Sequence, residues 1–262
     1  MTSAFGLRLQ IDQHPEQINS FWQRRLPKLL VPCVVVNIIG LILNYFEGEK
    51  ISLWKLIYIN DWVIWLLVCY LIFWLSYKII KGYDIAAVVL VITFSAMIYA
   101  LKAYITRPTW CPEVIGFIWG IILFHKKNEF IIKMREHWMR KIAFLCCTAG
   151  VVGICYLEFK YIEFWGDYLL KIVLGLLIII FLLALNTKIS IGNKIGFLLG
   201  NVSFEVYLLH GMVFGLIKII MPQLSSGAFI IVSMIATVLL SVVAHNLSIR
   251  ILQYSQKIMQ NG

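Results

Sequence analysis

Apolar residues fill long stretches of this chain, and polar residues collect in the short segments between them. A hydrocarbon layer about 30 Å thick needs roughly 20 apolar residues per crossing helix, and most of the stretches approach that length. The pattern therefore predicts eight transmembrane helices. They are placed at residues 29–46, 61–80, 84–101, 112–125, 142–158, 168–186, 195–219 and 227–247.

These stretches are apolar around their whole circumference. Alternation with a period of two, which a membrane barrel would show, is absent, so helices are indicated. We expect an all-α, polytopic integral membrane helix bundle. The stretch at 112–125 is the weakest: it starts at Pro112, ends near His125 and barely crosses at about 1.5 Å per residue, so it could be tucked or re-entrant.

Composition supports the same class. Of 262 residues, 61% are hydrophobic and 14% are charged, and the mean hydropathy is +0.87. A soluble domain cannot cover that much apolar surface. We expect a single membrane-embedded domain over residues 1–262 without a soluble domain. The longest connection, 126–141, has room for only one amphipathic interfacial helix, and the polar segment 8–23 lacks the order of a signal peptide.

Basic residues predict the orientation, because short loops rich in Lys and Arg stay in the cytoplasm. With eight crossings both termini share one side, and most of the 23 basic residues fall there. We therefore expect both termini in the cytoplasm. The net charge of +10 then reflects topology and attraction to anionic membrane lipids, and nucleic-acid binding is not expected. The basic residues on that side are Arg8, Arg24, Arg25, Lys28, Lys78, Lys81, Lys126, Lys127, Lys133, Arg135, Arg140, Lys141, Lys188, Lys194, Arg250 and Lys257.

Nothing in the sequence indicates a metal or a resident cofactor. The six cysteines lie mainly inside the predicted helices, with no CxxC and no Cys/His ligand spacing. A phosphate-binding loop of the GxGxxG type is also absent. We expect no metal and no bound cofactor.

A cationic cluster precedes the first predicted membrane helix. Arg24, Arg25 and Lys28 lie at its cytoplasmic, N-terminal end. Positive side chains, free backbone N–H groups and the helix dipole together make a potential anion site there, and phosphates are the obvious cytoplasmic anions. The alternative is a topogenic cluster that only holds the helix end inside.

Polar side chains also interrupt the apolar segment around 200–211. Ser203, Tyr207 and His210 are spaced i, i+4 and i+7 and share one helix face, with Glu205 turned well away from His210. Ionisable groups at bilayer depth are expensive, which favours a functional role. The alternative is interhelical hydrogen bonding, with Asn201 or Ser203 capping a helix that starts late.

The remaining histidines are expected near the membrane interface rather than in a catalytic site. His245 lies near the cytoplasmic end of the last predicted helix, His125 and His137 flank the basic segment, and His14 precedes the membrane. This leaves His210 as the only deeply embedded imidazole that could serve as a base.

Two of these segments resemble a known family. Residues 21–32 (FWQRRLPKLLVP) are similar to the RxxR-type segment that opens a membrane helix in the membrane-bound acyltransferase 3 family. Residues 200–210 (GNVSFEVYLLH) are similar to its late S-Y-x-x-Y-L-x-H element, and 61–65 and 114–120 resemble its middle helices. The resemblance spans nearly the whole chain.

The chain also departs from the family pattern. Lys28 stands where the second Arg of the basic motif is usual, and Phe204 replaces the commoner Tyr. Residues 2–7 (TSAFGL) look like the end of the family's SGYGL passage, which normally follows two further helices. One of those helices carries a basic-x10-His motif with the family's acid/base histidine, and His14 has neither its membrane context nor its basic residue. The chain is therefore expected to be an N-terminally truncated member.

The resemblance implies a bacterial inner-membrane enzyme that transfers an acyl group, commonly acetyl, from cytoplasmic acyl-CoA to a hydroxyl of a cell-surface polysaccharide or lipid-linked sugar. Under this interpretation Arg24, Arg25 and Lys28 bind the phosphates of acyl-CoA. Ser203, Glu205 and Tyr207 line the substrate pocket and His210 is the candidate catalytic residue. The alternatives are an inactive truncated remnant and a transporter of a sugar or lipid-linked intermediate.

Overall fold

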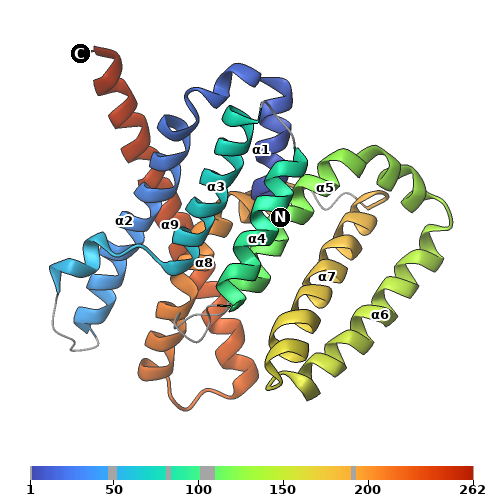
Figure 1. The fold of residues 1–262 in the computed structure, drawn as a ribbon. Coiled ribbons are helices and arrows are strands. Elements are labelled where there is room, and N and C mark those ends of the chain that lie inside the picture. Colours follow the sequence, from blue (N-terminus) through green and yellow to red (C-terminus); the bar gives the residue numbers. More distant parts are fainter. Residues whose placement is uncertain (1, 47–51, 81–83, 101–109, 190–192, 262) are drawn as a thin grey trace. The chain divides into compact units, whose positions relative to one another are not determined.

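The computed structural model describes residues 2–46, 52–80, 84–100, 110–189 and 193–261 (Figure 1). Within these ranges the chain forms helices joined by turns, without strands, so the prediction of an all-α protein is confirmed. The α-helices are α1 (Thr2–Gln13), α2 (Phe21–Phe46), α3 (Asp61–Ile79), α4 (Asp84–Ala100), α5 (Trp110–Arg135), α6 (Trp138–Phe159), α7 (Lys171–Asn186), α8 (Lys194–Ile220) and α9 (Ser226–Asn261). The shorter elements are the 3-10 helices η1 (Pro15–Ile18) and η2 (Leu53–Ile57) and the π-helix η3 (Glu163–Leu170).

Each predicted apolar stretch falls in helical structure over nearly all of its described residues, with residue 101 outside them, but not every helix is long enough to cross a bilayer. Among the described residues, five helical segments are long and apolar enough: Phe21–Tyr45, Leu53–Ile79, Trp138–Phe159, Gly196–Ile220 and Ser226–Ser255. Apolar helices Asp84–Met97 and Lys171–Asn186 are shorter. The chain is thus a multi-pass membrane protein, and the count of eight crossings stays a prediction.

The basic segment 126–141 differs from its expectation. It holds no separate interfacial helix: α5 continues to Arg135 and α6 begins at Trp138. Between them His137 adopts a left-handed conformation with φ 47°, which turns the chain sharply. The Trp138 Nε1–H donates to the Ala184 carbonyl at 2.9 Å, so the start of α6 is fastened to the end of α7, and the two helices run side by side (Figure 1).

The polar start of the chain also forms a helix that the pattern did not predict. α1 buries Ala4, Leu7 and Ile11, which are spaced i, i+3 and i+7, and packs against α5. Phe5 and Leu9, the other apolar residues of α1, lie off this stripe. The helical period is therefore weak in the sequence, and packing rather than propensity stabilises the helix.

The described residues divide into two compact units. Unit 1 comprises Met1–Phe21 and Ile64–Ile191, and so contains α1, most of α3, and α4 to α7. Unit 2 comprises Trp22–Val63 and Gly192–Gly262, and so contains nearly all of α2, the start of α3, α8 and α9.

Aromatic rings fill the core of unit 1. Phe73 of α3 and Phe117 of α5 are fully buried, and their ring centroids lie 6.1 Å apart, edge to face. Tyr70 lies 6.2 Å from Phe117. Such pairs contribute about 0.5–1.5 kcal/mol beyond their buried area. They fasten α3 to α5.

A charged cluster joins four helices of unit 1. The Asp84 carboxylate at the start of α4 accepts from Arg8 Nε at 3.0 Å and from the Tyr77 hydroxyl at 2.5 Å, and it also pairs with His125 Nε2. The Arg8 guanidinium lies 4.8 Å from the centroid of the Phe124 ring. Both carboxylate oxygens of Asp84 are therefore occupied, as a polar joint among α1, α3, α4 and α5 requires.

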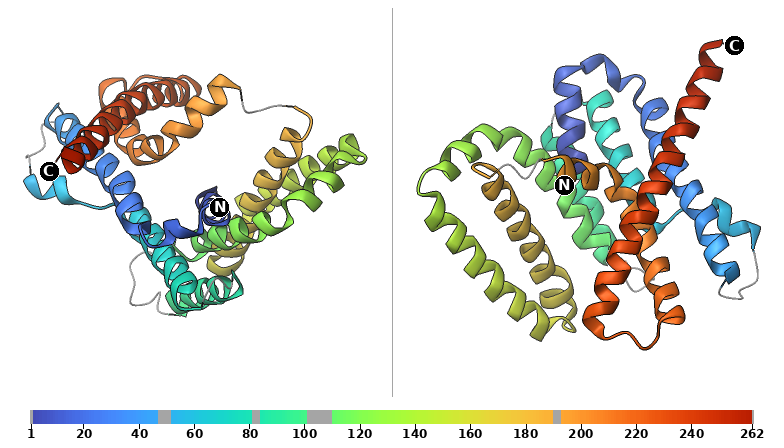
Figure 2. Two further views of the ribbon diagram at one scale, coloured as in Figure 1. Left: turned by 90° about the horizontal axis from the view of Figure 1, so that it is seen from above. Right: turned by 180° about the vertical axis from the view of Figure 1, so that it is seen from behind.

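In unit 2, α8 and α9 form an antiparallel pair joined by a short turn (Figure 2). The buried face of α9 carries small residues, each exposed by 2% or less, that allow close approach of the two backbones. They are Ser233, Thr237, Ser241, Ala244 and Ser248.

The other close packing in unit 2 joins α2 to α8. A Cβ added at Gly40 would lie 2.7 Å from Met212 Sδ, so the absence of a side chain makes room for the methionine. Asn37 of α2 donates from Nδ2 to the carbonyls of Leu56, at 3.0 Å, and Tyr58, at 2.7 Å. These bonds hold the η2 segment against α2.

Candidate functional site

The three predicted phosphate-binding cations lie in the first turns of α2. Arg24 and Lys28 are exposed and Arg25 is half-buried. Pro27 lies among them and has no N–H to donate, so the backbone here is less completely bonded than in a regular helix. Arg25 lies eight residues before Cys33 and so on nearly the same face of α2, whereas Arg24 and Lys28 lie on other faces of the helix.

The predicted polar face of α8 is continuous. Asn193 caps the helix by accepting from the Gly196 N–H at 2.8 Å, so the alternative in which Asn201 or Ser203 caps a helix that starts late is wrong. The Ser203 hydroxyl donates to the Gly200 carbonyl at 2.8 Å. Ser203 and its neighbours on this face lie well inside the helix, with its backbone bonds intact around them.

Aromatic rings border this face. The Trp62 ring lies 4.5 Å from that of Tyr207 and 5.9 Å from that of Phe204, between centroids. The His210 ring lies 5.6 Å from Tyr207, and its Nδ1 is 2.6 Å from the Tyr207 carbonyl oxygen. A carbonyl only accepts, so Nδ1 carries the hydrogen and Nε2 is left as an acceptor. Tyr207 and His210 are exposed.

Glu205 points to a different neighbour, which sequence reasoning missed. Its carboxylate is 3% exposed, and Oε1 is 3.0 Å from His245 Nδ1 on α9. His245 lies inside the membrane-length segment Ser226–Ser255. His245 is thus a second imidazole within a membrane-length segment, besides His210 in Gly196–Ile220. No periodicity signals a pair forty residues apart; only the cost of a buried carboxylate could have prompted a search for its partner.

The second oxygen of Glu205, Oε2, is buried and has no hydrogen-bond partner among the described residues. Cys33 of α2 is also buried, and it lines a cavity of about 50 Å³ together with Asn37, Tyr58 and Asn60 and with Leu208 and Met212 of α8. This volume suits one or two water-sized groups.

The structure thus pairs Glu205 with His245, places Cys33 in a small cavity against α8, and places Tyr207, His210 and Trp62 along another face of α8. Arg25 lies about two helical turns before Cys33 on α2. No three His, Cys, Asp or Glu side chains within the described ranges are arranged to hold a metal ion.

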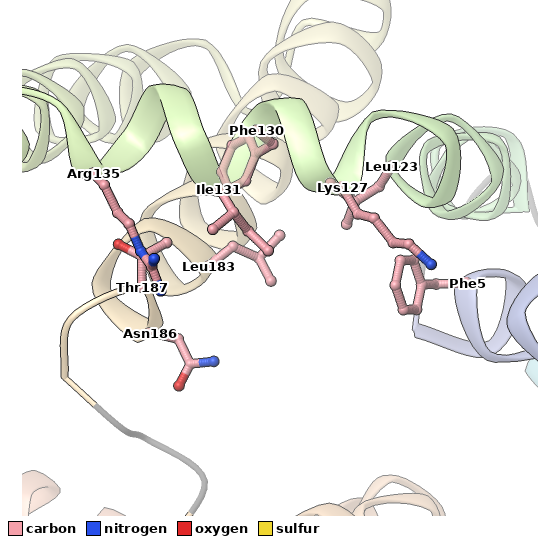
Figure 3. Close-up of a pocket in the computed structure, with 9 residues that line it drawn as sticks. All are labelled: Phe5, Leu123, Lys127, Phe130, Ile131, Arg135, Leu183, Asn186 and Thr187. Carbon is pink, nitrogen blue, oxygen red and sulfur yellow. The ribbon is translucent and has the colours of Figure 1, made fainter.

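Unit 1 contains a separate cavity with cationic ends (Figure 3). It has a volume of about 240 Å³ and lies among α1, α5 and α7. Figure 3 shows Lys127 beside Phe5 at one end and Arg135 beside Thr187 at the other, with Ile131 and Leu183 between them. Within the described chain, no carboxylate pairs with Lys127 or Arg135. Arg135 lies at the C-terminal end of α5, where a cation offsets the negative end of the helix dipole.

These features define a class: a multi-pass helical membrane protein with cations at one helix start and ionisable groups within its membrane-length helices. The family model for the acyltransferase domain of the acyltransferase 3 family matches residues 4–246. The chain belongs to this family, as the sequence resemblance indicated. Searches of curated proteins and of solved structures gave no match.

Proposed function

We propose that this protein is a membrane-bound O-acyltransferase. It moves an acyl group, in our proposal acetyl, from cytoplasmic acyl-CoA to a hydroxyl of a cell-surface polysaccharide or lipid-linked sugar. The observation that carries the proposal is the family match, which covers residues 4–246 and so includes both the cations of α2 and the polar segment of α8.

The donor's phosphates bind at the start of α2. Arg24, Arg25 and Lys28 supply three positive charges within the first two turns, where free backbone N–H groups and the helix dipole also favour an anion. The cavity of Figure 3 offers two cations instead, but Arg135 is at a helix C-terminus, where the dipole opposes an anion. Of these two sites, charge and dipole favour an anion together at the start of α2 alone, which favours it as the CoA site.

The acceptor sugar binds along the exposed face of α8. The Trp62 and Tyr207 rings offer apolar faces for stacking against a sugar ring. His210 Nε2 and the Ser203 hydroxyl can bond to sugar hydroxyls beside them. A mixed aromatic and polar face suits a carbohydrate better than an acyl chain.

The first experiment tests the reaction in cells. A host that lacks the gene is complemented with the complete gene, and the acyl content of its surface glycans is measured by mass spectrometry. We expect O-acetyl groups to return with the gene. The protein is expressed at the same level as an active member of the family. If the glycans then remain unacylated, the result would contradict the proposed function and favour a transporter or an inactive remnant.

The second experiment tests the donor site with a matched loss of charge. Arg24→Ala/Arg25→Ala is compared with Lys127→Ala/Arg135→Ala, since each double variant removes two cations. We expect the α2 variant to raise KM for acetyl-CoA tenfold or more, because charge-assisted hydrogen bonds each contribute about 1.5–3 kcal/mol. A larger rise in this KM for Lys127→Ala/Arg135→Ala would indicate instead that the donor phosphates bind in the cavity of Figure 3.

A further inference from the structure

The cavity of Figure 3 carries two cations that the proposed reaction does not use. Its walls come from α1, α5 and α7, all within unit 1, and its volume is about 240 Å³. Lys127 and Arg135 lie eight residues apart on α5, about 12 Å along the helix axis, and at opposite ends of the cavity. Each cation therefore offers a separate position for an anionic group.

The carboxylate of α5 nearest to these cations is bonded to other lysines. Glu129 does not line the cavity, and its two oxygens accept from Lys126 Nζ at 3.2 Å and from Lys133 Nζ at 2.6 Å. Lys127 Nζ lies instead 4.4 Å from the centroid of the Phe124 ring, which attracts an ammonium without neutralising it. In the part of the chain that the structure describes, Arg135 has no carboxylate partner either. The cavity thus retains two positive charges.

The Arg135 end of the cavity lies at the depth of lipid headgroups. The membrane-length segment of α6 begins at Trp138, three residues after Arg135. Trp138 Nε1 donates to the carbonyl of Ala184, three residues before Thr187 of the cavity wall. Because tryptophan side chains concentrate at the membrane interface, Arg135 and Thr187 are placed at the level of the lipid phosphates.

Between the two cations the cavity wall is apolar and comprises Leu123, Phe130, Ile131 and Leu183. We propose that this cavity binds the headgroup of an anionic phospholipid that carries two phosphates joined by a short linker. One phosphate pairs with Lys127 and the other with Arg135, and the acyl chains extend along the apolar side chains. The volume is below the roughly 300–1,000 Å³ of pockets for drug-sized ligands, so it suits a headgroup rather than a whole lipid.

A lipid suits this cavity better than the soluble donor does. Arg135 is at the C-terminal end of α5, where the helix dipole opposes an anion and weakens the attraction of the guanidinium. The acyl chains keep a lipid in the bilayer, so its headgroup reaches the cavity at a high local concentration and a moderate attraction fills the site. Acyl-CoA arrives from solution. The lipid site does not depend on whether the chain transfers acyl groups.

Native mass spectrometry of the complete protein tests the site, because it counts the lipids bound to each chain. Diphosphatidylglycerol, which carries two phosphates, is titrated and compared with phosphatidylglycerol at equal total charge. Lys127→Ala/Arg135→Ala removes both cavity cations. The control Lys126→Ala/Arg140→Ala removes one lysine and one arginine that are exposed in the same basic segment and lie outside the cavity. Lys127→Arg/Arg135→Lys exchanges the two cations and keeps both charges.

We expect Lys127→Ala/Arg135→Ala to weaken binding of diphosphatidylglycerol about tenfold or more, because each cation contributes to the attraction of the headgroup. The control and the exchange variant stay within about threefold of the parent, and phosphatidylglycerol binds the parent about fivefold more weakly. Equal weakening in the cavity variant and the control would overturn the inference, since it would indicate attraction to overall charge. Equal affinity for the two lipids, or displacement of the lipid by acetyl-CoA, would also overturn it.

Lysine modification in nanodiscs locates the lipid on the unsubstituted protein. An amine-reactive acetylating reagent modifies accessible lysines, and peptide mass spectrometry gives the rate at each one. We expect diphosphatidylglycerol to slow the modification of Lys127 about threefold or more relative to phosphatidylglycerol at equal charge. Lys126, whose side chain is 68% exposed, should keep its rate. Equal protection of the two lysines would overturn the inference and leave the acyltransferase proposal standing.

Discussion

At the scale of single residues, the carboxylates of Asp84 and Glu205 differ in how completely their oxygens are hydrogen-bonded. Asp84 accepts from Arg8 and Tyr77 and pairs with His125, and its side chain is 13% exposed. Glu205 has one partner and one unbonded oxygen. Complete bonding is what a structural carboxylate needs, whereas incomplete bonding leaves capacity for a ligand or a reaction.

Asp84→Asn is therefore expected to destabilise unit 1. The amide removes the negative charge opposite Arg8 and leaves the guanidinium half-buried, at an expected cost of about 2 kcal/mol. Thermal unfolding in detergent, followed by tryptophan fluorescence, measures the change. Asp12→Asn is the control, because Asp12 is 53% exposed and its contact with Arg8 is 3.6 Å. Equal melting temperatures for the two variants would contradict a structural role for Asp84.

Lys28→Arg should strengthen the donor site. The guanidinium adds the bidentate fork that an ammonium lacks, and we expect KM for acetyl-CoA to fall a few-fold. Lys78→Arg is the control, because Lys78 is occupied over the Trp74 ring at 4.9 Å. A KM unchanged by Lys28→Arg would show that Lys28 contributes only to topology.

The sequence predicted which polar residues share one face of α8, but it did not predict the contact between Glu205 on α8 and His245 on α9. Helical spacing places Ser203, Tyr207 and His210 on one face, because i, i+4 and i+7 positions are fixed by the helix itself. The partner of Glu205 depends on how α9 packs against α8, and His245 looks interfacial when α9 is read alone. The periodicity of a single helix does not determine which of its side chains contact a neighbouring helix.

At the scale of elements, the small residues of α9 determine how closely it approaches α8. The Ser233 and Ser241 hydroxyl oxygens are buried without a hydrogen-bond partner in the described chain, so these residues contribute small volume rather than hydrogen bonds. The sequence predicted α8 within one residue at each end and the start of α9 within one residue, but α9 continues to Asn261, well beyond the predicted end at residue 247. It did not predict the α1–α5 contact, because the apolar residues of α1 do not form one clear stripe at helical spacing.

Substitutions at Ser241 separate size from polarity. Ser241→Ala should leave the melting temperature unchanged or slightly higher, since it removes an unsatisfied buried hydroxyl. Ser241→Leu should destabilise the protein by about 1–3 kcal/mol, because the larger side chain forces the helices apart. Thermal melts of both variants provide the measurement. A destabilised Ser241→Ala would show that the hydroxyl, not the volume, stabilises the pair.

The C-terminal end of α5 carries a pH-sensitive contact. A hydrogen bond from Lys133, at 2.6 Å, and a second from Lys126 lower the pKa of Glu129 below its ordinary value. A lowered carboxylate pKa stabilises the fold above the unfolded-state pKa, and this stabilisation is lost as the pH falls through the folded-state pKa. Hydrogen exchange at 126–135 should be faster in Glu129→Gln than in the parent near pH 7, and the two should converge below about pH 4. A difference that persists in acid would exclude this ion pair as its cause.

At the scale of the whole molecule, the number of crossings decides which side each loop faces. If the eight apolar helices all cross, Ser225, between α8 and α9, is outside and the C-terminus is in the cytoplasm. If only the five membrane-length segments cross, both positions are reversed. Composition alone establishes the class, but length cannot establish whether short helices such as α7 span a bilayer.

Cysteine labelling distinguishes the two topologies. In a background without the six natural cysteines, Ser225→Cys and Lys188→Cys are treated in intact cells with a membrane-impermeant maleimide. Eight crossings predict labelling of Ser225→Cys alone, with Lys188→Cys labelled only after lysis. Labelling of Lys188→Cys but not Ser225→Cys in intact cells would show that α7 does not cross and that the termini lie on opposite sides.

The contact between Glu205 and His245 also has a consequence for biosynthesis. The ribosome completes α8 well before His245 has been synthesised, so the carboxylate emerges without its imidazole. Releasing α8 alone into lipid would cost on the order of 2–3 kcal/mol for the acid. Pausing α8 beside the insertion machinery until α9 arrives avoids that cost. Cells should therefore insert the last two helices as one hairpin, and a ribosome stalled between them should hold a helix not yet committed to the bilayer.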